Sequence, residues 1–463
     1  MTAEATEAEE LERTPGEGLP EENPADPYGL DSRAYKRGKW GCFLNELAQN
    51  FAANFVSATY LAAMMIWLGI SASRIAFVLS LSSFGGCARA FAPYVAPKIR
   101  RTKLFVGIGM IVHLIPMAAL FFLPLLPEEV RHHSFFLILA VYAVYCFFVQ
   151  FLSPAYAELR EVYAEHDAKT ERFYAVLTIC QNVAQGFSFL ALTVLCNQME
   201  GSRDLYPIFG GIALVSFLFR IIIYFILIRE PKMPKVKSPG NFFAGMADMI
   251  RSKKYRPFLL YAILVAAGNA LITGIETVFF VERMGLSITF ISLTNTYGLA
   301  GRILTAPLWA KLAEKIGAKR GLGIAAFLCA FTYFVNVGMT PTNAELIRWI
   351  AHTIGIFGCA GTAVLVVPVQ YSCMPEDKHY AYLSFITVLT GAIAYPLGLL
   401  VSGIVKWADG WSVMLGSFAL SEMHLLYLAC GLCYVATFIL LFHSAKRAPE
   451  SDPSRTEGEI EHE

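Results

Sequence analysis

Long apolar runs separated by short polar segments dominate the chain. Each run holds about 20 residues or more, which is the length that an α-helix needs to cross roughly 30 Å of hydrocarbon. The twelve runs lie near residues 42–68, 73–95, 103–126, 134–157, 173–196, 206–228, 257–281, 288–310, 320–340, 346–371, 381–405 and 421–443. The pattern therefore predicts an all-α integral membrane protein with twelve transmembrane helices.

The short motifs between the first six runs recur between the last six. A Gly-Ser turn, LGIS at 68–71, follows the first run, and MGLS at 284–287 follows the seventh run about 216 residues later. Gly85 and Gly301 keep the same register, and each unit ends in a cluster of Lys and Arg. Two related halves of this kind are typical of secondary transporters built from structural repeats around a central path.

The polar segments divide the chain into five parts. We expect disordered cytoplasmic tails at both ends, because both are rich in Glu and lack apolar runs. Between them we expect two six-helix bundles joined by a linker. The boundaries are 1–40 for the first tail, 41–228 for the first bundle, 229–256 for the linker, 257–445 for the second bundle and 446–463 for the last tail.

The linker contains one amphipathic segment. Its apolar residues fall on one helical face, and basic residues follow directly after it. Such a face predicts a cytoplasmic helix that lies on the anionic inner leaflet of the membrane. A helix that docks onto a protein is the alternative. The apolar residues are Phe242, Phe243, Met246, Met249 and Ile250.

The distribution of charge predicts the orientation of the chain. Most of the 37 Lys and Arg residues lie on the side of the membrane that both termini share. Because cytoplasmic loops carry an excess of Lys and Arg, we expect both termini to be cytoplasmic, in a plasma or inner membrane. The opposite side carries only Arg74, Arg131, Arg203, Arg283, Arg348 and Lys406.

Composition narrows the possible partners. With 56% hydrophobic and 16% charged residues, the chain has more apolar side chains than a soluble core of this length would bury, so we expect the lipid bilayer to cover the remainder. The net charge of +1 gives no broad basic surface for nucleic acid. We expect a monomer that binds a small molecule.

The sequence lacks the motifs of an enzyme. No H-E-x-x-H, G-x-S-x-G or G-x-x-x-x-G-K-[ST] motif occurs. All ten cysteines lie in or at the edges of the apolar runs, where cysteine behaves as a small hydrophobe. We therefore expect no enzyme activity, no cofactor, no metal and no direct use of ATP.

One loop carries a resemblance to a known family. Residues 310–320 read AKLAEKIGAKR, which resembles the cytoplasmic loop signature Gly-x-Leu-Ala-Asp-Arg-x-Gly-Arg-Arg of the major facilitator superfamily. Ala310 replaces the first Gly and Glu314 replaces the Asp, and the matching loop of the first half has Pro97 where the acid should be. The resemblance covers residues 40–445.

The resemblance implies two pseudo-symmetric six-helix halves that rock against each other by alternating access. It also implies a cytoplasmic latch that ties helix ends together in the outward-facing state. In this sequence the latch residues would be Glu314, Lys315, Lys319 and Arg320.

Polar residues at membrane depth predict the transport path. Each costs free energy unless it faces the bundle interior or water. On the first run the polar positions recur at helical spacing, and the fifth and later runs show similar faces. Ties between helices, worth about 1 kcal/mol each, are the alternative role for such residues. The candidates are Glu46, Gln49, Asn50, Asn54, Gln181, Gln185, Asn269, Thr273, Glu276, Asn295, Arg302 and His352.

The ionisable candidates carry the chemistry. We expect Glu276 in apolar surroundings, where a carboxylate is costly while charged, so that it either couples transport to protons or forms a fixed pair with an Arg. Glu46 lies near the cytoplasmic end of its run, where we expect water. Arg302 would hold an anionic substrate or pair near Glu314.

These observations predict a secondary transporter that moves a small solute and is coupled to an ion gradient, with H⁺ as the expected ion and symport as the expected mode. Proton-driven efflux of amphipathic compounds is the alternative, and a membrane receptor or membrane-embedded enzyme fits less well. A neutral polyhydroxylated solute, an amphipathic compound and a small organic anion all remain open as substrates.

Overall fold

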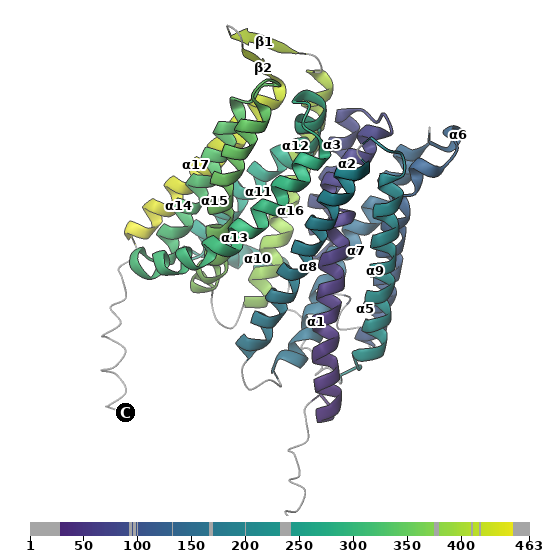
Figure 1. The fold of residues 1–463 in the computed structure, drawn as a ribbon. Helices are drawn as coiled ribbons and strands as arrows, with labels where there is room; N and C mark the ends of the chain where they lie inside the picture. Colours follow the sequence, from purple (N-terminus) through teal and green to yellow (C-terminus); the bar gives the residue numbers. More distant parts are fainter. Residues whose placement is uncertain are drawn as a thin grey trace, which may run out of the picture.

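A computed structural model shows a nearly all-helical molecule (Figure 1). It describes residues 28–91, 95, 99, 101–131, 133–165, 170–199, 201–231, 242–374, 379–408, 411–415 and 418–447. Most of the two expected tails, and the loop of the first half that matches the latch, lie outside these residues.

The first half runs from α1 to α9. Two short helices, η2 and α6, lie between α5 and α7. The elements are α1 (Ser32–Phe55), α2 (Ala58–Trp67), α3 (Ala72–Ala88), α5 (Thr102–Leu120), η2 (Leu123–Leu125), α6 (Glu128–Arg131), α7 (Ser134–Glu165), α8 (Thr170–Met199) and α9 (Leu205–Leu227).

The second half runs from α11 to α17, and α10 precedes it. A short antiparallel hairpin of β1 and β2 lies before the last helix. The elements are α10 (Phe242–Arg251), α11 (Arg256–Thr273), α12 (Glu276–Val278), η3 (Phe279–Arg283), α13 (Ile288–Ile316), α14 (Ala318–Val337), α15 (Ala344–Cys373), α16 (His379–Trp407), β1 (Ser412–Leu415), β2 (Phe418–Ser421) and α17 (Glu422–Arg447).

Twelve membrane crossings follow from these elements. Among the described residues, nine helices are long and apolar enough to cross a membrane by themselves, and α3 is a shorter apolar helix. The interrupted pair α1 and α2 and the long helix α13 complete the set. The predicted fold class, twelve helices in two six-helix halves, is confirmed.

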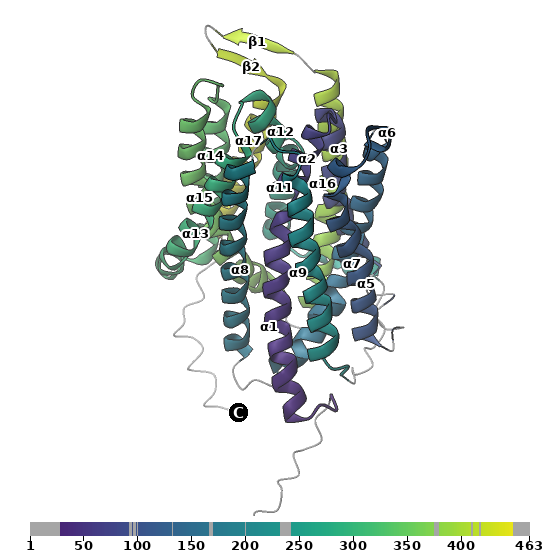
Figure 2. The ribbon, with the colours of Figure 1, turned by 45° about the vertical axis from the view of Figure 1, so that its right-hand side comes forward.

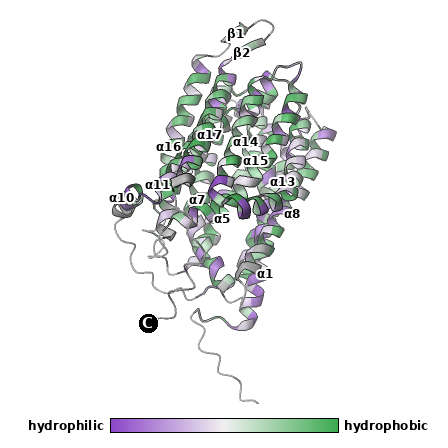
Figure 3. Ribbon diagram, turned by 90° about the vertical axis from the view of Figure 1, so that its left-hand side faces the viewer, coloured by the Kyte–Doolittle hydropathy of each residue, from purple (hydrophilic) through white to green (hydrophobic). Residues whose placement is uncertain are grey.

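The outer faces of the helices are apolar. Large side chains such as Phe187, Val215 and Leu304 are 64–75% exposed on the isolated chain. Figure 3 shows the same pattern, because the middles of the helices are mainly hydrophobic. Lipid would cover these side chains in a membrane.

The first helix begins earlier than the sequence predicts. The expected disordered tail reaches residue 40, whereas α1 begins at Ser32. The Oδ1 atom of Asp31 accepts a hydrogen bond from the backbone N–H of Ala34 at 2.6 Å and so caps the helix. Tyr35 is buried and packs edge-on against Tyr163 of α7. The prediction is wrong for this stretch because packing, which composition does not reveal, extends the helix beyond the apolar run.

The linker helix α10 packs on protein. It contacts α11 and α16, and its residue Met249 is fully buried in a cluster with Tyr255 and Phe258. Ile250 stays exposed. Part of the apolar face predicted to lie on lipid therefore covers the end of the second half.

We call the side where α1 begins and α17 ends the terminal face, and the side that holds β1 and β2 the hairpin face (Figures 1 and 2). The first and seventh crossings are both interrupted. The chain leaves the helix between Phe55 and Ala58, and again between Thr273 and Glu276. The two breaks fall at matching places in the internal repeat, and the segments after them, α2 and α12, contact each other.

The halves meet most closely along α3 and α16. Gly391 has no side chain, and a Cβ there would lie 2.7 Å from the backbone oxygen of Ser83. Near the hairpin face, the Oγ atom of Ser73 donates to the backbone oxygen of Ser402 at 3.0 Å. The Oγ atom of Ser402 donates in turn to the backbone oxygen of Ser73 at 2.8 Å. Small residues thus let the two helices approach closely.

Two further hydrogen bonds join the halves near the hairpin face, and one from Nη1 of Arg89 to Oγ1 of Thr387 at 3.0 Å joins them nearer the terminal face. The hydroxyls of Tyr60 and Ser292 lie 2.7 Å apart and are buried. The hydroxyl oxygens of Thr193 in α8 and Thr296 in α13 lie 3.2 Å apart. All four residues lie in the parts of their helices nearer the hairpin face, so the halves are closed together on that side.

Candidate functional site

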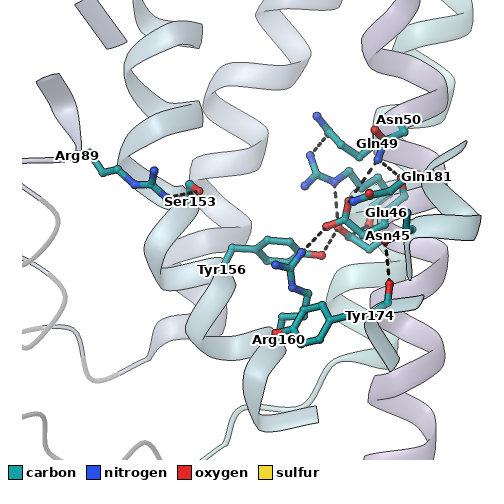
Figure 4. Close-up of polar contacts among 12 residues, drawn as sticks. Asn45, Glu46, Gln49, Asn50, Arg89, Ser153, Tyr156, Arg160, Tyr174 and Gln181 are labelled. Carbon is teal, nitrogen blue, oxygen red and sulfur yellow. Dashed lines mark hydrogen bonds and ion pairs between the residues drawn. The ribbon is translucent and has the colours of Figure 1, made fainter. Parts of the chain in front are cut away.

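Glu46 lies at the centre of a buried polar network in the first half (Figure 4). Its side chain is buried, and its Oε1 atom lies 3.2 Å from Nη1 of Arg160 in an ion pair. Its Oε2 atom accepts hydrogen bonds from Nε2 of Gln181 at 3.0 Å and from Nδ2 of Asn50 at 3.3 Å. The expectation that Glu46 is wet is therefore wrong, because three side chains surround the carboxylate.

The network extends along the polar face of α1. The Oδ1 atom of Asn50 accepts from Gln185 at 3.2 Å, and Nδ2 of Asn54 donates to Ser188 at 2.5 Å. The predicted polar faces of the first and fifth runs therefore do face each other. The side-chain amides of Asn50, Asn54, Gln181 and Gln185 each have a hydrogen-bond partner in the protein, as a tie between helices requires.

Arg220 of α9 closes the other side of the network. It donates to Oδ1 of Asn45 at 3.1 Å and to Oε1 of Gln49. Tyr156 of α7 donates to the same Asn45 oxygen at 2.9 Å. Gln49 thus contacts a buried guanidinium.

Sequence reasoning missed the pairing of Glu46 with Arg160. Arg160 lies against the rings of Tyr156 and Tyr174, with its guanidinium carbon 6.0 and 5.5 Å from the ring centroids. A signal existed, because Glu46 lies early in the first apolar run and Arg160 lies just after the end of the fourth, which places both toward the same side of the membrane. Nothing in the sequence indicates that α1 and α7 contact each other there.

A second group of polar residues lines a cavity in the second half, which we call the charged cavity. It encloses about 220 Å³ between α12, α13, α14 and α15, and Thr59 of α2 reaches it from the first half. The polar residues that line it are Thr59, Glu276, Thr277, Asn295, Arg302, Cys329, Thr332, Tyr333, Asn336, Arg348, His352 and Cys359.

Glu276 begins α12 directly after the helix break and forms an ion pair across the cavity. Its Oε1 atom lies 3.5 Å from Nη1 of Arg348, whose side chain is only 8% exposed. Arg348 in turn lies over the ring of Phe280, with its guanidinium carbon 4.3 Å from the centroid. The side chain of Glu276 is 45% exposed, so the expected apolar surroundings are wrong. The break opens space that a continuous helix would fill.

Three more predicted residues share the cavity. The Nε atom of Arg302 donates to the backbone oxygen of Gly298 one turn earlier, at 3.3 Å. His352 fits against Gly298, which has no side chain to occupy that space. Asn295 also lines the wall. Four predicted candidates, Glu276, Asn295, Arg302 and His352, therefore meet in one place.

Three buried polar atoms of residues that line the cavity have no hydrogen-bond partner among the described residues. They are Nε of Arg348, Nε2 of His352 and Oδ1 of Asn336. The pattern of polar residues predicts neither Asn336 nor Arg348 for the path. The sequence places Arg348 in a loop outside the membrane, whereas its side chain is buried in the second turn of α15.

Two other candidates lie elsewhere. The Oδ1 atom of Asn269 accepts a hydrogen bond from Tyr434 of α17 at 2.8 Å. The hydroxyl of Thr273 donates to the backbone oxygen of Asn269 at 2.8 Å. Neither residue lines the charged cavity. Within the part of the chain that the structure describes, no group of three or more His, Cys, Asp and Glu is placed to hold a metal.

The latch residues lie at the junction of α13 and α14 on the terminal face. Gly317 joins the helices with a φ of 85°, which favours glycine. Glu314 and Lys315 precede it, and Lys319 and Arg320 follow it. Glu314 is exposed, and no ion pair between described residues includes it.

The buried ion pair of the first half yields a test of stability. We expect Arg160→Gln to lower the melting temperature of the purified protein strongly, since removing one partner of a buried pair costs about 3–5 kcal/mol. The double variant Glu46→Gln with Arg160→Gln should recover most of the loss. As a control, Arg229→Gln removes an exposed contact with Asp31 at 3.7 Å and should cost at most about 1 kcal/mol. Equal losses in Arg160→Gln and Arg229→Gln would contradict the buried pair.

Comparison with solved structures shows which proteins share this fold. A mutant of the nucleoside transporter NupG has a TM-score of 0.66 at 13% identity, covering 88% of this chain and 99% of that one. A POT family transporter in complex with 5-aminolevulinic acid has a TM-score of 0.65 at 13% identity, covering 89% and 96%. A peptide transporter POT mutant in complex with alafosfalin has a TM-score of 0.66 at 12% identity, covering 89% and 94%. At these identities the likeness establishes the fold.

Comparison of sequences identifies the family. No curated protein matches the chain. The model of the Major Facilitator Superfamily matches residues 42–399, which is most of the chain, with nearly all of the first half and much of the second. The chain therefore belongs to the Major Facilitator Superfamily and is a multi-pass membrane transporter.

Proposed function

We propose that this protein is a proton-coupled secondary transporter of a small polar solute, with the charged cavity as part of its path. The observation that carries the proposal is the ion pair of Glu276 with Arg348, which lies in a cavity at a break in the seventh crossing. The similar structures include nucleoside and peptide transporters by name, and these cargoes are polar solutes.

The Glu276 pair offers a way to link proton binding to conformation. While ionised, Glu276 is held by Arg348 of α15. Protonation removes its negative charge and with it the attraction to Arg348, so α12 and α15 lose one electrostatic tie. A group whose charge changes the stability of one state biases the equilibrium between the two. The other titratable or charged groups that line the cavity around Glu276 are Arg302, Cys329, Tyr333, His352 and Cys359.

The contacts between the halves are weak enough to open. Near the hairpin face the hydrogen bonds between them involve hydroxyl groups, such as those of Tyr60 and Ser292. Each such bond in a membrane protein contributes about 1 kcal/mol. A few of these bonds can be exchanged for similar contacts elsewhere. This suits a molecule that closes first one face and then the other.

The Glu46 network serves a different role in this proposal. Its carboxylate has an ion pair and two amide donors, and the whole group is shared among α1, α7 and α8. Such a set stabilises the first half as one body. We therefore assign proton coupling to Glu276 and treat Glu46 as the next candidate.

We expect Glu276→Gln to retain substrate exchange between equal pools and to lose uphill accumulation driven by a pH gradient. The amide keeps the shape of the side chain and removes the titration. Reconstituted vesicles with and without a pH gradient measure both activities. Glu345→Gln is the matched control, because Glu345 is exposed in the first turn of α15 and should not affect either activity. If Glu276→Gln accumulates substrate as well as the parent does, Glu276 has a structural role and does not couple transport to protons.

We further propose that the loop between α13 and α14 latches the terminal face in the other conformation. Its Glu314 is exposed here, without an ion pair to a described residue, and so is available for basic or helix-end groups when that face closes. Glu314→Gln should slow the maximal transport rate with little change in substrate affinity. Glu314→Asp, which restores the family's residue, should keep the rate. A normal rate for Glu314→Gln would remove the latch from the mechanism.

For orientation we propose that the terminal face is cytoplasmic, in a plasma or inner membrane. The excess of Lys and Arg on that side supports this. A Ser202→Cys variant should react with a membrane-impermeant thiol reagent added to intact cells, whereas Ser238→Cys should react only after permeabilisation. Labelling of Ser238→Cys in intact cells would show that the orientation is the opposite of the one proposed.

A further inference from the structure

We propose that the charged cavity binds a small hydroxylated carboxylate, with the carboxylate held by Arg302. This inference deepens the proposed function and rests on it, because it names the class of solute that the path would carry. It depends on the charges, the unpartnered polar atoms and the size of the cavity.

The charges of the cavity are unbalanced. Three charged side chains line it, Glu276, Arg302 and Arg348. Glu276 forms an ion pair with Arg348 at 3.5 Å. Arg302 therefore remains as a cation that has no carboxylate within ion-pair distance among the residues described.

Arg302 is exposed on the isolated chain, and a cation without a counter-ion at membrane depth must face water or a ligand and so marks a path for substrate or ions. Arg302 lies 14 residues after Ile288, the first residue of α13, which places it roughly 21 Å from the hairpin-face end of that helix. A carboxylate ligand would supply the missing charge. The guanidinium group suits it, because its planar fork can donate two parallel hydrogen bonds to a carboxylate.

The unpartnered atoms of the cavity call for a ligand with hydroxyl groups. Nε2 of His352, Oδ1 of Asn336 and Nε of Arg348 are buried without a hydrogen-bond partner, and a buried polar atom without a partner destabilises the fold. The amide oxygen of Asn336 can only accept, whereas the ring nitrogen of His352 donates or accepts according to its tautomer. A hydroxyl group can do both and so satisfies either atom.

The polar groups are spread along the cavity, so the ligand would be several carbon atoms long. His352 lies 8 residues after Ala344, the first residue of α15, and so roughly 12 Å from the hairpin-face end. Arg302 lies deeper, at roughly 21 Å by the same rise per residue. A carboxylate at Arg302 would thus direct the rest of the ligand toward His352 and Asn336.

The volume of the cavity argues against an amphipathic drug-like compound. It encloses about 220 Å³, whereas sites for drug-sized ligands measure about 300–1,000 Å³ and are mainly apolar. Cationic compounds are disfavoured further by Arg302 and Arg348. Of the substrate classes that the sequence left open, the small organic anion therefore fits this cavity best.

Direct binding to the purified full-length protein tests the inference. The probes are lactate, glycerate, tartrate and gluconate as hydroxycarboxylates, sorbitol as the uncharged partner of gluconate, and tetraphenylphosphonium as an amphipathic cation. We expect at least one hydroxycarboxylate to raise the melting temperature and to titrate in calorimetry, while sorbitol and tetraphenylphosphonium do neither. Failure of all four hydroxycarboxylates, or equal binding of sorbitol and gluconate, would overturn the proposal.

Variants of Arg302 locate the carboxylate. Arg302→Gln should weaken hydroxycarboxylate binding about ten- to a hundredfold, the loss of one charge-assisted contact, whereas Arg302→Lys should lose less because it keeps the charge. Lys406→Gln is the matched control, since Lys406 is an exposed cation at the end of α16. Unchanged binding by Arg302→Gln would exclude Arg302 as the anchor.

A second measurement reports on the cavity without any substrate. In a variant that keeps Cys359, which lines the cavity, as its sole cysteine, the anionic reagent 2-sulfonatoethyl methanethiosulfonate should react faster than its trimethylammonium analogue. Arg302→Gln should reduce that preference. An equal or reversed preference would contradict an anion site even if Arg302→Gln failed to fold.

The outcomes separate this inference from the proposed function. Binding and thiol labelling need no proton gradient. Selective anion binding combined with normal accumulation by Glu276→Gln would contradict the proton coupling alone. Loss of anion selectivity combined with proton-driven accumulation would contradict the anion site alone.

Discussion

The cost of placing charge inside a membrane is the constraint on which the rest of this structure depends. An ionised side chain in hydrocarbon is tolerated only with a partner or with water. Glu46 pairs with Arg160, and Glu276 pairs with Arg348. Each pair joins different crossings of the chain, so satisfying the charges also determines which helices lie together.

The two carboxylates at membrane depth solve this problem in opposite ways. Glu46 is buried among amides and an Arg, with every oxygen in use. Glu276 has one partner, lies at a helix break and is nearly half exposed in a cavity. The first arrangement holds helices in place, and the second leaves the carboxylate partly exposed, as the proton coupling that we propose requires. The same residue type therefore has different surroundings in the two halves.

Small side chains complete the architecture where the halves meet. Gly391 and Ser83 allow α3 and α16 to approach within contact of their backbones. The interrupted crossings place α2 against α12, and Thr59 of α2 reaches the cavity of the opposite half. A movement of the first half would thus change the wall of the cavity directly. This connects the packing of the halves to the site that we propose for substrate.

The sequence by itself determined the membrane fold, the number of crossings and the two-half repeat, because apolar runs of helix length have one physical solution in lipid. It also selected four of the cavity residues, since polar groups at that depth must face inward. It could not show that Glu276 lies at a helix break or that Arg348 turns toward it. Nor could it show that Asn269 faces Tyr434 instead of the cavity. Those features depend on which side chains of distant segments share the same space, and only the packing of the helices in three dimensions decides that.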